Sequence, residues 1–289
     1  MGDAGYGGHR SAPGLMTISD DGHREVASAP MSDQSAIHVE TAGRSFGTTS
    51  AFRDVSFSVA SESFAAIVGA SGSGKTTLLR CIAGLEELTS GQVQVLGRPV
   101  EAPSSRCVYV FQDYRRSLFP WRTVVKNVSF PLEMSGVNRT KARQRAIKQL
   151  EIVGLDHRAD AFTWQLSGGM QQRVAIARAL AADPEILLMD EPFGAVDAQT
   201  RMELQLALLD IWRRLGKTIL FVTHDIDEAL FLADRILVLD VRGDGLALNR
   251  TVRLPRPRSH TETPALPEFT DLRSEVLQIL FQSNLKDDD

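Results

Sequence analysis

Residues 69–76 read G-A-S-G-S-G-K-T, a pattern of glycine, lysine and hydroxyl side chains that suits the binding of phosphate groups. The glycines allow the backbone to turn so that several N–H groups point at one anion. Lys75 adds a positive charge for the terminal phosphates, and the Thr76 hydroxyl is a hard oxygen ligand suited to Mg²⁺. The pattern therefore predicts a site for a nucleoside phosphate.

The surrounding sequence supports this prediction over a chance match. Residues 64–68 form an apolar run that predicts a buried strand, and residues 77–83 have the spacing of a helix with Leu78, Leu79 and Ile82 inward. Strand, glycine loop and helix is the setting that a phosphate loop needs. A second Gly-Lys-Thr at residues 216–218 lacks the upstream glycine, and we interpret Gly216 as the C-cap of a helix.

An acidic pair at the end of another apolar run supplies the remaining chemistry. Residues 186–189 run into Asp190, Glu191 and Pro192. We predict that Asp190 holds Mg²⁺ through water and that Glu191 is the general base for an attacking water. The alternative is a turn that merely ends a strand.

The pattern of elements predicts an α/β fold. Alternating segments at 37–40 and 55–59 predict an antiparallel β subdomain, and a buried strand at 107–111 ends at Gln112. Strands separated by helices predict a mostly parallel core sheet covered on both faces, with 236–239 as its last strand. Residues 113–182 form a predicted helical insertion, in which Ser167 is a plausible N-cap.

Composition bounds the domains and the function. We expect a disordered tail over 1–35, one domain over 36–250 and a C-terminal extension with a short helix over 251–289. A net charge of −4 gives no reason to expect nucleic acid as a partner.

Cys81 and Cys107 are predicted to be free and buried. No run reaches transmembrane length and no signal peptide is evident, so we expect a cytosolic chain that meets a membrane through a partner.

One further segment gives a specific resemblance. Residues 166–173 read L-S-G-G-M-Q-Q-R, which is similar to the L-S-G-G-Q-x-x-R signature, with Met170 in place of the usual glutamine. Taken alone, the segment could be a capped helix start with two glycines. Together with residues 69–76 and Asp190-Glu191, it makes the chain resemble the ATP-binding cassette (ABC) transporter ATPases over about residues 37–245.

The resemblance implies roles for particular residues. Phe46 would stack on adenine, where a plain core aromatic is the alternative, and Asp197 belongs to a segment in which Gly194 replaces the usual serine. Catalytic roles fall to Lys75, Gln112, Glu191 and His224, and Mg²⁺ ligation falls to Thr76, Gln112 and Asp190. The ATP-binding residues implied are Phe46, Gly69, Ser71, Gly72, Ser73, Gly74, Lys75, Thr76, Thr77, Gln112, Ser167, Gly168, Gly169 and Asp197.

The resemblance also implies partners. In the family, the signature of one subunit covers the ATP of another, so a second copy of this chain would complete the site and drive a membrane permease. The sequences at 118–124 (L-F-P-W-R-T-V) and 254–258 (L-P-R-P-R) look like the nitrate, sulfonate and taurine import ATPases, which act with an extracytoplasmic solute-binding protein on the cytoplasmic side of the membrane. An exporter ATPase and a soluble ABC protein are the alternatives. Arg115 and Arg116 are hypothesised to meet acidic permease residues, although a solvated basic turn explains them equally well.

Overall fold

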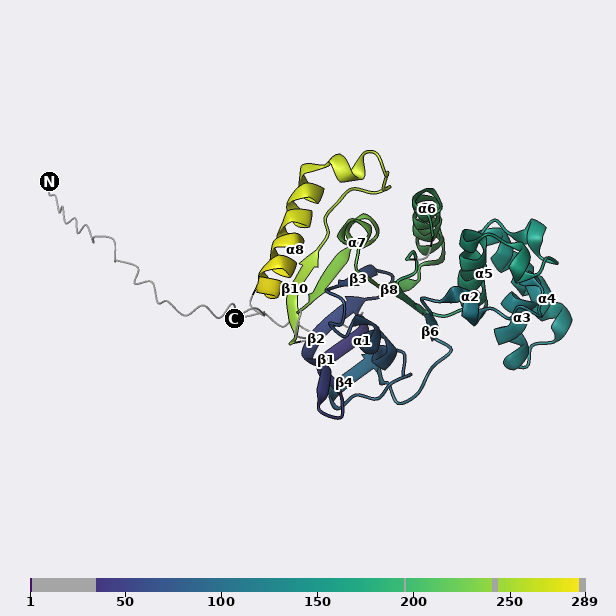
Figure 1. Cartoon of the computed structure of the whole chain (residues 1–289), viewed down its shortest axis with the longest axis horizontal. Coiled ribbons are helices and arrows are strands. Elements are labelled where there is room, and N and C mark those ends of the chain that lie inside the picture. Colours follow the sequence, from purple (N-terminus) through teal and green to yellow (C-terminus); the bar gives the residue numbers. More distant parts are fainter. Residues whose placement is uncertain (2–34, 195, 241–243, 286–289) are drawn as a thin grey trace. The chain divides into compact units, whose positions relative to one another are not determined.

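A six-stranded sheet with the strand order β10-β9-β3-β8-β7-β6 lies at the centre of the fold (Figure 1). The computed structural model describes residues 1, 35–194, 196–240 and 244–285. The strands of this sheet are β3 (Phe64–Val68), β6 (Cys107–Val110), β7 (Ile186–Asp190), β8 (Thr218–Thr223), β9 (Arg235–Leu239) and β10 (Leu246–Thr251). All pairings are parallel except that of β10 with β9, which confirms the predicted mostly parallel α/β sheet.

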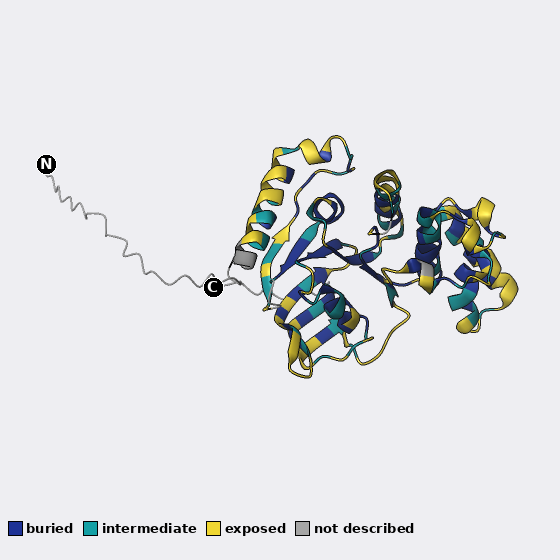
Figure 2. Ribbon diagram, viewed as in Figure 1, coloured by how far each residue is buried: buried dark blue, intermediate teal, exposed yellow. Residues whose placement is uncertain are grey.

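The parallel order brings four loops to one edge of the sheet. Strands β3, β7 and β8 are buried at every residue, as their apolar runs predict for strands covered on both faces (Figure 2). Because these strands and β6 run in the same direction, the loops that follow them all leave at the carboxyl edge, where ligands bind in such sheets.

A second, antiparallel sheet covers the first helix. It has the order β2-β1-β4-β5, with strands β1 (Ser35–Phe46), β2 (Thr49–Ala60), β4 (Ser90–Val95) and β5 (Arg98–Pro99). Helix α1 (Lys75–Ile82) packs between the two sheets, and its Leu78, Leu79 and Ile82 lie in the same core cluster as Ile37 and Val39. The expected antiparallel β subdomain is therefore present.

Four helices gather beyond the β6 edge of the central sheet (Figure 1). They are α2 (Tyr114–Ser117), α3 (Val124–Met134), α4 (Arg139–Ile152) and α5 (Gly168–Ala181), with 3-10 turns at Asp156–Arg158 and Thr163–Gln165. They pack on one another through Val125, Val128, Leu150 and Val174. We refer to residues 114–181 as the helical subdomain.

The C-terminal part differs from the prediction in two respects. Residues 246–251 form strand β10, so the expectation that 236–239 is the last strand was wrong. Only Leu246, Ala247 and Leu248 are apolar in this half-exposed edge strand, which explains the weak sequence signal. Helix α8 (Pro267–Leu285) has 19 residues and is not short.

Two more helices, α6 (Ala198–Leu215) and α7 (Ile226–Leu232), lie between the carboxyl edge of the sheet and the C-terminal segment. Helix α6 ends at Gly216, which has a positive φ of 57° as a C-cap, in line with the prediction. Helix α7 follows β8 and packs against α8. The Arg273 guanidinium of α8 pairs with Asp227 of α7 at 2.6 Å, a half-exposed contact between the two helices.

The structure also bears on the predictions for the cysteines, for membrane-spanning helices and for the N-terminal tail. Cys81 and Cys107 are free and buried, and burial raises their thiol pKa values to about 11 and about 12, respectively. Among the described helices, none combines the length and apolar character needed to cross a bilayer. The expected tail over 1–35 falls almost wholly outside the described residues; Ser35 begins β1.

Candidate functional site

The glycine loop after β3 adopts the turns that its sequence predicts. Gly72 and Gly74 have positive φ values of 83° and 86°, a conformation that side chains other than glycine rarely take. At Gly74 a Cβ atom would also lie 2.3 Å from the Ala51 carbonyl oxygen of β2. Two of the loop's glycines are therefore required by backbone geometry, one of them also by the close approach of β2.

Lys75 lies at the start of α1 with its ammonium inside the loop. Its Nζ donates to the carbonyl oxygens of Gly69 at 2.9 Å and Ala70 at 2.6 Å. Burial lowers the pKa of Lys75, while the charges of Glu191 and Asp190 act to raise it. The positive charge is thus bonded to the loop's own carbonyl oxygens and has two carboxylates near it.

Three oxygen-bearing side chains meet at Asp190. The Thr76 hydroxyl donates to Asp190 Oδ1 at 2.9 Å, and the Tyr109 hydroxyl donates to Oδ2 at 2.8 Å. A carboxylate and a hydroxyl on neighbouring elements form a hard-oxygen set of the kind that suits Mg²⁺ held partly through water. Tyr109 was not predicted; it lies on β6, three residues before Gln112, and burial raises its pKa.

Glu191 is contacted by Gln112 and His224, two side chains to which the resemblance assigns catalytic roles. Gln112 Nε2 donates to Glu191 Oε2 at 2.9 Å, and His224 Nδ1 lies 3.3 Å from Glu191 Oε1. Three loops, after β6, β7 and β8, thus converge on one carboxylate. Glu191 has a φ of 43°, a left-handed conformation that is unfavourable for a non-glycine residue and often marks a functional position.

A cavity of about 540 Å³ joins these groups at the carboxyl edge of the sheet. Its lining consists of Ala51, Ser71, Gly72, Gly74, Lys75, Thr76, Thr77, Gln112, Glu191 and His224. Ala51, on β2, was not anticipated. Phe46 does not belong to this lining; it lies at the end of β1, is 49% exposed and has the Arg44 guanidinium 4.5 Å from its ring centre.

The signature segment lies apart from this cavity. Among the described residues that line the cavity, Ser167, Gly168 and Gly169 are absent. Ser167 caps α5, accepting a hydrogen bond from the Met170 N–H at 3.4 Å. A Cβ atom at Gly169 would lie 2.2 Å from Thr200 Cγ2, so α5 begins directly against α6.

Asp197 and Thr200 hold the start of α6 beside the signature. Asp197 Oδ1 accepts from the Thr200 N–H at 3.0 Å, and Oδ2 accepts from its hydroxyl at 2.7 Å. These bonds, with the backbone N–H bond first, lower the pKa of Asp197. The predicted Asp197 and the unpredicted Thr200 therefore shape one surface with residues 167–169.

A buried hydrogen bond links α6 to α7. Gln205 Nε2 donates to Glu228 Oε1 at 3.0 Å, and the Glu228 N–H donates to Asp225 Oδ1 at 3.0 Å. Burial is the largest cause of a raised pKa at Glu228. Since His224 directly precedes Asp225, this bond ties the position of His224 to α6. The sequence shows Glu228 near His224 but gives no sign of Gln205.

Comparison with known families identifies relatives of the described domain. The profile of the ABC transporter family matches residues 52–194. A taurine import ATP-binding protein from Rhizobium johnstonii is 44% identical over 237 residues, covering 81% of this chain and 90% of that protein. A nitrate import ATP-binding protein from Synechocystis is 44% identical over 239 residues, covering 81% and 89%.

Solved structures give the same result. The cbiO1 protein of Clostridium perfringens, part of an ABC transporter complex, matches with a TM-score of 0.72 and 26% identity, over 88% of this chain and 99% of that one. A dimeric bacterial ABC transporter cassette matches with a TM-score of 0.66 and 32% identity, over 75% and 99%. A post-hydrolysis dimer bound to ADP and phosphate matches with a TM-score of 0.65 and 31% identity, over 75% and 99%.

Proposed function

The chain belongs to the ABC transporter family, and we propose that it is the ATP-hydrolysing subunit of an importer for a small nitrate-, sulfonate- or taurine-like solute. The observation that carries this proposal is the convergence of Gln112 and His224 on Glu191 at the mouth of the phosphate-loop cavity. The names of the nitrate and taurine import relatives support import over export or a soluble role.

The proposed hydrolysis follows from this geometry. The backbone N–H groups of residues 71–77 and the Lys75 ammonium hold the β- and γ-phosphates. Glu191 orients a water molecule toward the γ-phosphorus and takes its proton as the new P–O bond forms and the bond to ADP breaks. Gln112 and His224 keep the Glu191 carboxylate in place, with His224 facing the γ-phosphate. Mg²⁺ near Thr76, Asp190 and Gln112 would neutralise phosphate charge.

A second copy of the chain completes the proposed site. Ser167, Gly168 and Gly169 lie on another surface than the cavity, so they are available to cover the ATP held by a partner subunit. The similarity to dimeric cassettes supports this arrangement. We propose a head-to-tail dimer that encloses two ATP molecules, with Phe46 beside the adenine of its own subunit.

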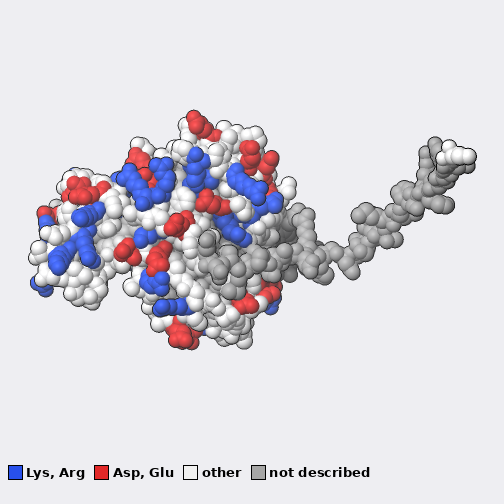
Figure 3. All heavy atoms as spheres, turned by 180° about the vertical axis from the view of Figure 1, so that it is seen from behind, with Lys and Arg blue, Asp and Glu red and all other residues white. Residues whose placement is uncertain are grey.

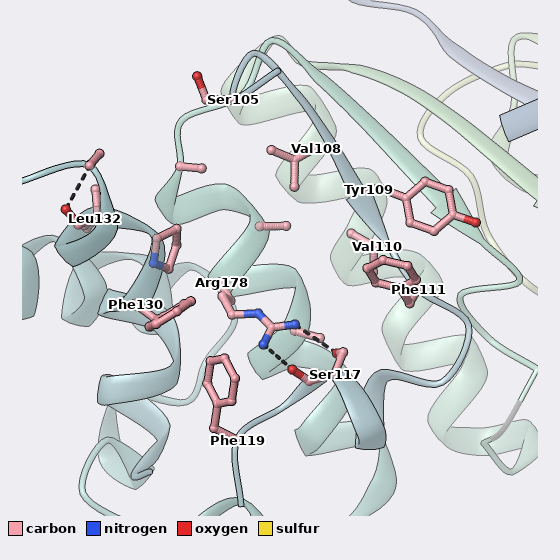
Figure 4. A pocket seen from close by; sticks show the side chains of 15 residues that line it. Ser105, Val108, Tyr109, Val110, Phe111, Ser117, Phe119, Phe130, Leu132 and Arg178 are labelled. Atoms are coloured by element: carbon pink, nitrogen blue, oxygen red, sulfur yellow. Dashed lines mark hydrogen bonds between the residues drawn. The ribbon is translucent and has the colours of Figure 1, made fainter. Parts of the chain in front are cut away.

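The permease is proposed to dock in an apolar groove beside the Gln112 loop. The groove has a volume of about 480 Å³ and lies between β6, α3 and α5 (Figure 4). Its apolar walls include Val108, Phe111, Phe119 and Phe130, and it begins next to Gln112. A helix of the permease seated here would bring the chain to the cytoplasmic face of the membrane, with a solute-binding protein on the far side.

Co-purification tests the proposal. The chain would be expressed with its cognate permease, isolated in detergent, and assayed for ATP hydrolysis with and without the permease. We expect a complex containing two copies of the chain whose ATP hydrolysis depends on Glu191. A chain that hydrolyses ATP but never associates with a permease would support the soluble alternative.

A further inference from the structure

Positive charge is concentrated in one part of the helical subdomain. Residues 114–152 span α2, α3 and α4, and they contain nine Lys and Arg residues but only two acidic residues, Glu133 and Glu151. The whole chain, in contrast, has a net charge of −4. A local excess of one sign attracts a partner of the opposite sign. This segment is therefore suited to a negatively charged partner.

A pocket of about 370 Å³ between α3 and α4 contains part of this charge, and we call it the basic pocket. Its lining includes four cations, Arg122, Lys126, Arg139 and Arg143, and Glu133 is the only acid among the described residues that line it. It shares no described lining residue with the nucleotide cavity or with the groove beside β6. The basic pocket is thus a separate feature of the surface.

Two of the four cations have no acidic partner within the chain. Arg122 and Arg143 each pair with a carboxylate, at 3.6 Å and 3.1 Å respectively. No ion pair found in the described part of the chain includes Lys126 or Arg139, and both side chains are exposed. A guanidinium fork and an ammonium are the groups with which proteins commonly bind phosphate oxygens. The basic pocket can therefore accept an anion of the phosphate type.

An indole ring borders the basic pocket. Trp121 belongs to the lining and is exposed. Trp164, also exposed, lies on the neighbouring segment, because Thr123 and Phe162 form a backbone bridge and the Phe162 ring stacks on Trp164. Exposed tryptophans beside Lys and Arg are typical of surfaces that meet lipid head groups. Since a dissolved anion would leave Trp121 in water, the combination favours a lipid surface.

The basic pocket lies beside the groove in which the permease is proposed to dock. Arg122, in the lining of the pocket, has its guanidinium carbon 4.9 Å from the ring centre of Phe130 and 5.7 Å from that of Phe119. Both phenylalanines belong to the groove wall. A permease segment seated in the groove would therefore bring the basic pocket toward the same membrane.

We propose that the basic pocket binds the phosphate of an anionic lipid, with Lys126 and Arg139 as the main contacts and Trp121 among the head groups. The inference goes beyond the proposed function, because a contact with lipid requires neither the permease nor ATP hydrolysis. Clusters of Lys and Arg are attracted to the anionic lipids of a membrane surface, and this attraction weakens with salt. The chain would thus have a second attachment to the membrane, independent of its protein partner.

Flotation with vesicles measures this contact. The purified full-length chain is mixed with vesicles of equal parts phosphatidylglycerol and phosphatidylcholine, or of phosphatidylcholine alone, and the bound fraction is measured after centrifugation. We expect affinity for the anionic vesicles to exceed that for the neutral ones about tenfold or more, and to fall steeply between about 0.05 M and about 0.5 M NaCl. Equal affinity for the two kinds of vesicle would overturn the inference.

Two double variants with the same change of charge locate the contact. Lys126→Gln with Arg139→Gln removes the unpaired cations of the basic pocket and should weaken binding to anionic vesicles about tenfold. Arg145→Gln with Lys148→Gln removes one Arg and one Lys from exposed positions of α4 outside the pocket, and this matched control should bind like wild type. Equal losses in both variants would indicate diffuse attraction and overturn the role of the pocket.

A third variant tests the aromatic contact. Trp121→Ala leaves the charge unchanged and should still weaken binding to anionic vesicles, because the indole no longer enters the head-group layer. Thermal unfolding and ATP binding should match wild type in all three variants, since every substituted side chain is exposed and lies outside the nucleotide cavity. Wild-type affinity of Trp121→Ala would show that the pocket attracts charge without contacting lipid, contrary to the proposal.

Competition separates a lipid from other anions. Inorganic phosphate that bound the wild-type chain in calorimetry, with no flotation of the chain, would make the basic pocket a site for a dissolved anion and overturn the inference. Tighter binding to a short duplex DNA than to the vesicles would assign the charge to nucleic acid, with the same consequence. A chain that floats with anionic vesicles but never associates with a permease would overturn the proposed function and leave this inference standing.

Discussion

At the scale of single residues, Glu191 combines the features expected of a catalytic base. It has a left-handed backbone conformation, its carboxylate is contacted by Gln112 and His224, and it lies beside the Lys75 charge. Its backbone N–H donates to the Val222 carbonyl of β8 at 2.9 Å, which holds the strained residue in place.

We predict that Glu191→Gln lowers turnover by about 10²–10⁴-fold while ATP binding persists. Glutamine keeps the shape of the side chain and can still bond to Gln112, but it cannot accept a proton from water. Steady-state hydrolysis and nucleotide binding measure the two effects, and the variant should accumulate as an ATP-bound dimer. Glu151→Gln, on exposed α4, is the control; near-normal hydrolysis by the Glu191 variant would refute the assignment as base.

Motif spacing predicts the site residues in the loops that follow the parallel strands. It does not predict the site residues that lie within strands. Gln112, Glu191 and His224 each follow an apolar run, so their common edge can be deduced. Tyr109 and Ala51 depend on which strand lies beside which, and that is decided by packing between distant segments. Nothing local in the sequence marks either residue.

At the scale of elements, α6 and α7 connect the signature surface to the catalytic edge. Helix α6 is capped by Asp197, its Thr200 lies against Gly169, and its Gln205 reaches Glu228 of α7. Helix α7 begins two residues after His224, with Asp225 as its N-cap, and packs against α8 on another side. Two contacts therefore join α6 to the segment that follows His224: the buried Gln205–Glu228 hydrogen bond and an ion pair between Arg201 and Asp225 at 3.6 Å.

We predict that Glu228→Gln changes the pH dependence of stability. The raised pKa of Glu228 means that the folded protein disfavours the charged form, while the unfolded chain ionises near pH 4.3. The unfolding free energy of the wild type should thus fall as pH rises above about 4.3. The glutamine variant lacks this titrating group, so its unfolding free energy should not fall for this reason. Thermal unfolding at pH 4 and pH 7 measures this, and the variant's relative stability should increase with pH.

The control for this change is Glu101→Gln on an exposed bend. A difference in melting temperature between wild type and Glu228→Gln that stayed constant with pH would contradict the account. Reduced hydrolysis with unchanged ATP affinity in the same variant would indicate that the Gln205–Glu228 bond also positions His224.

The elements that could not be predicted lie where the sequence is half polar. Strand β10 has three apolar residues and one neighbour in the sheet, so its alternation is too short to distinguish from a loop. The sequence also underestimated the length of α8, which has 19 residues. In the second half of this helix, among the residues whose burial is described, Val276 is the only fully buried apolar residue. The long parallel strands, in contrast, are evident from their continuous apolar runs.

At the scale of the whole molecule, the proposed ATP site is divided between two surfaces. One carries the cavity of residues 71–77, and the other carries Ser167 against α6. On the face shown in Figure 3, basic and acidic side chains are interspersed over much of the surface.

We predict that Ser167→Arg abolishes turnover but leaves ATP binding by the monomer intact, because the arginine would obstruct only the partner's nucleotide. Loss of binding in the monomer would instead make Ser167 purely structural.

Complementation tests the division directly. Lys75→Ala and Ser167→Arg should each be inactive, and an equal mixture should regain at most about one quarter of the wild-type sites, because half the dimers contain one intact composite site. Hydrolysis after mixing and re-equilibration measures this recovery. No recovery in mixed dimers verified by mass would contradict sites shared between subunits.

The tryptophans give the helical subdomain an intrinsic optical signal. Of the three in the chain, Trp121 and Trp164 are 73% and 68% exposed, whereas Trp212 donates its indole N–H to the Glu62 carbonyl and lies 4.4 Å beneath the Arg256 guanidinium. The Trp121 ring lies 5.5 Å from Phe119 in the groove wall. An occupant of the groove that also covered Trp121 would shift indole emission to shorter wavelength, so docking of a permease could be followed by fluorescence without any added label.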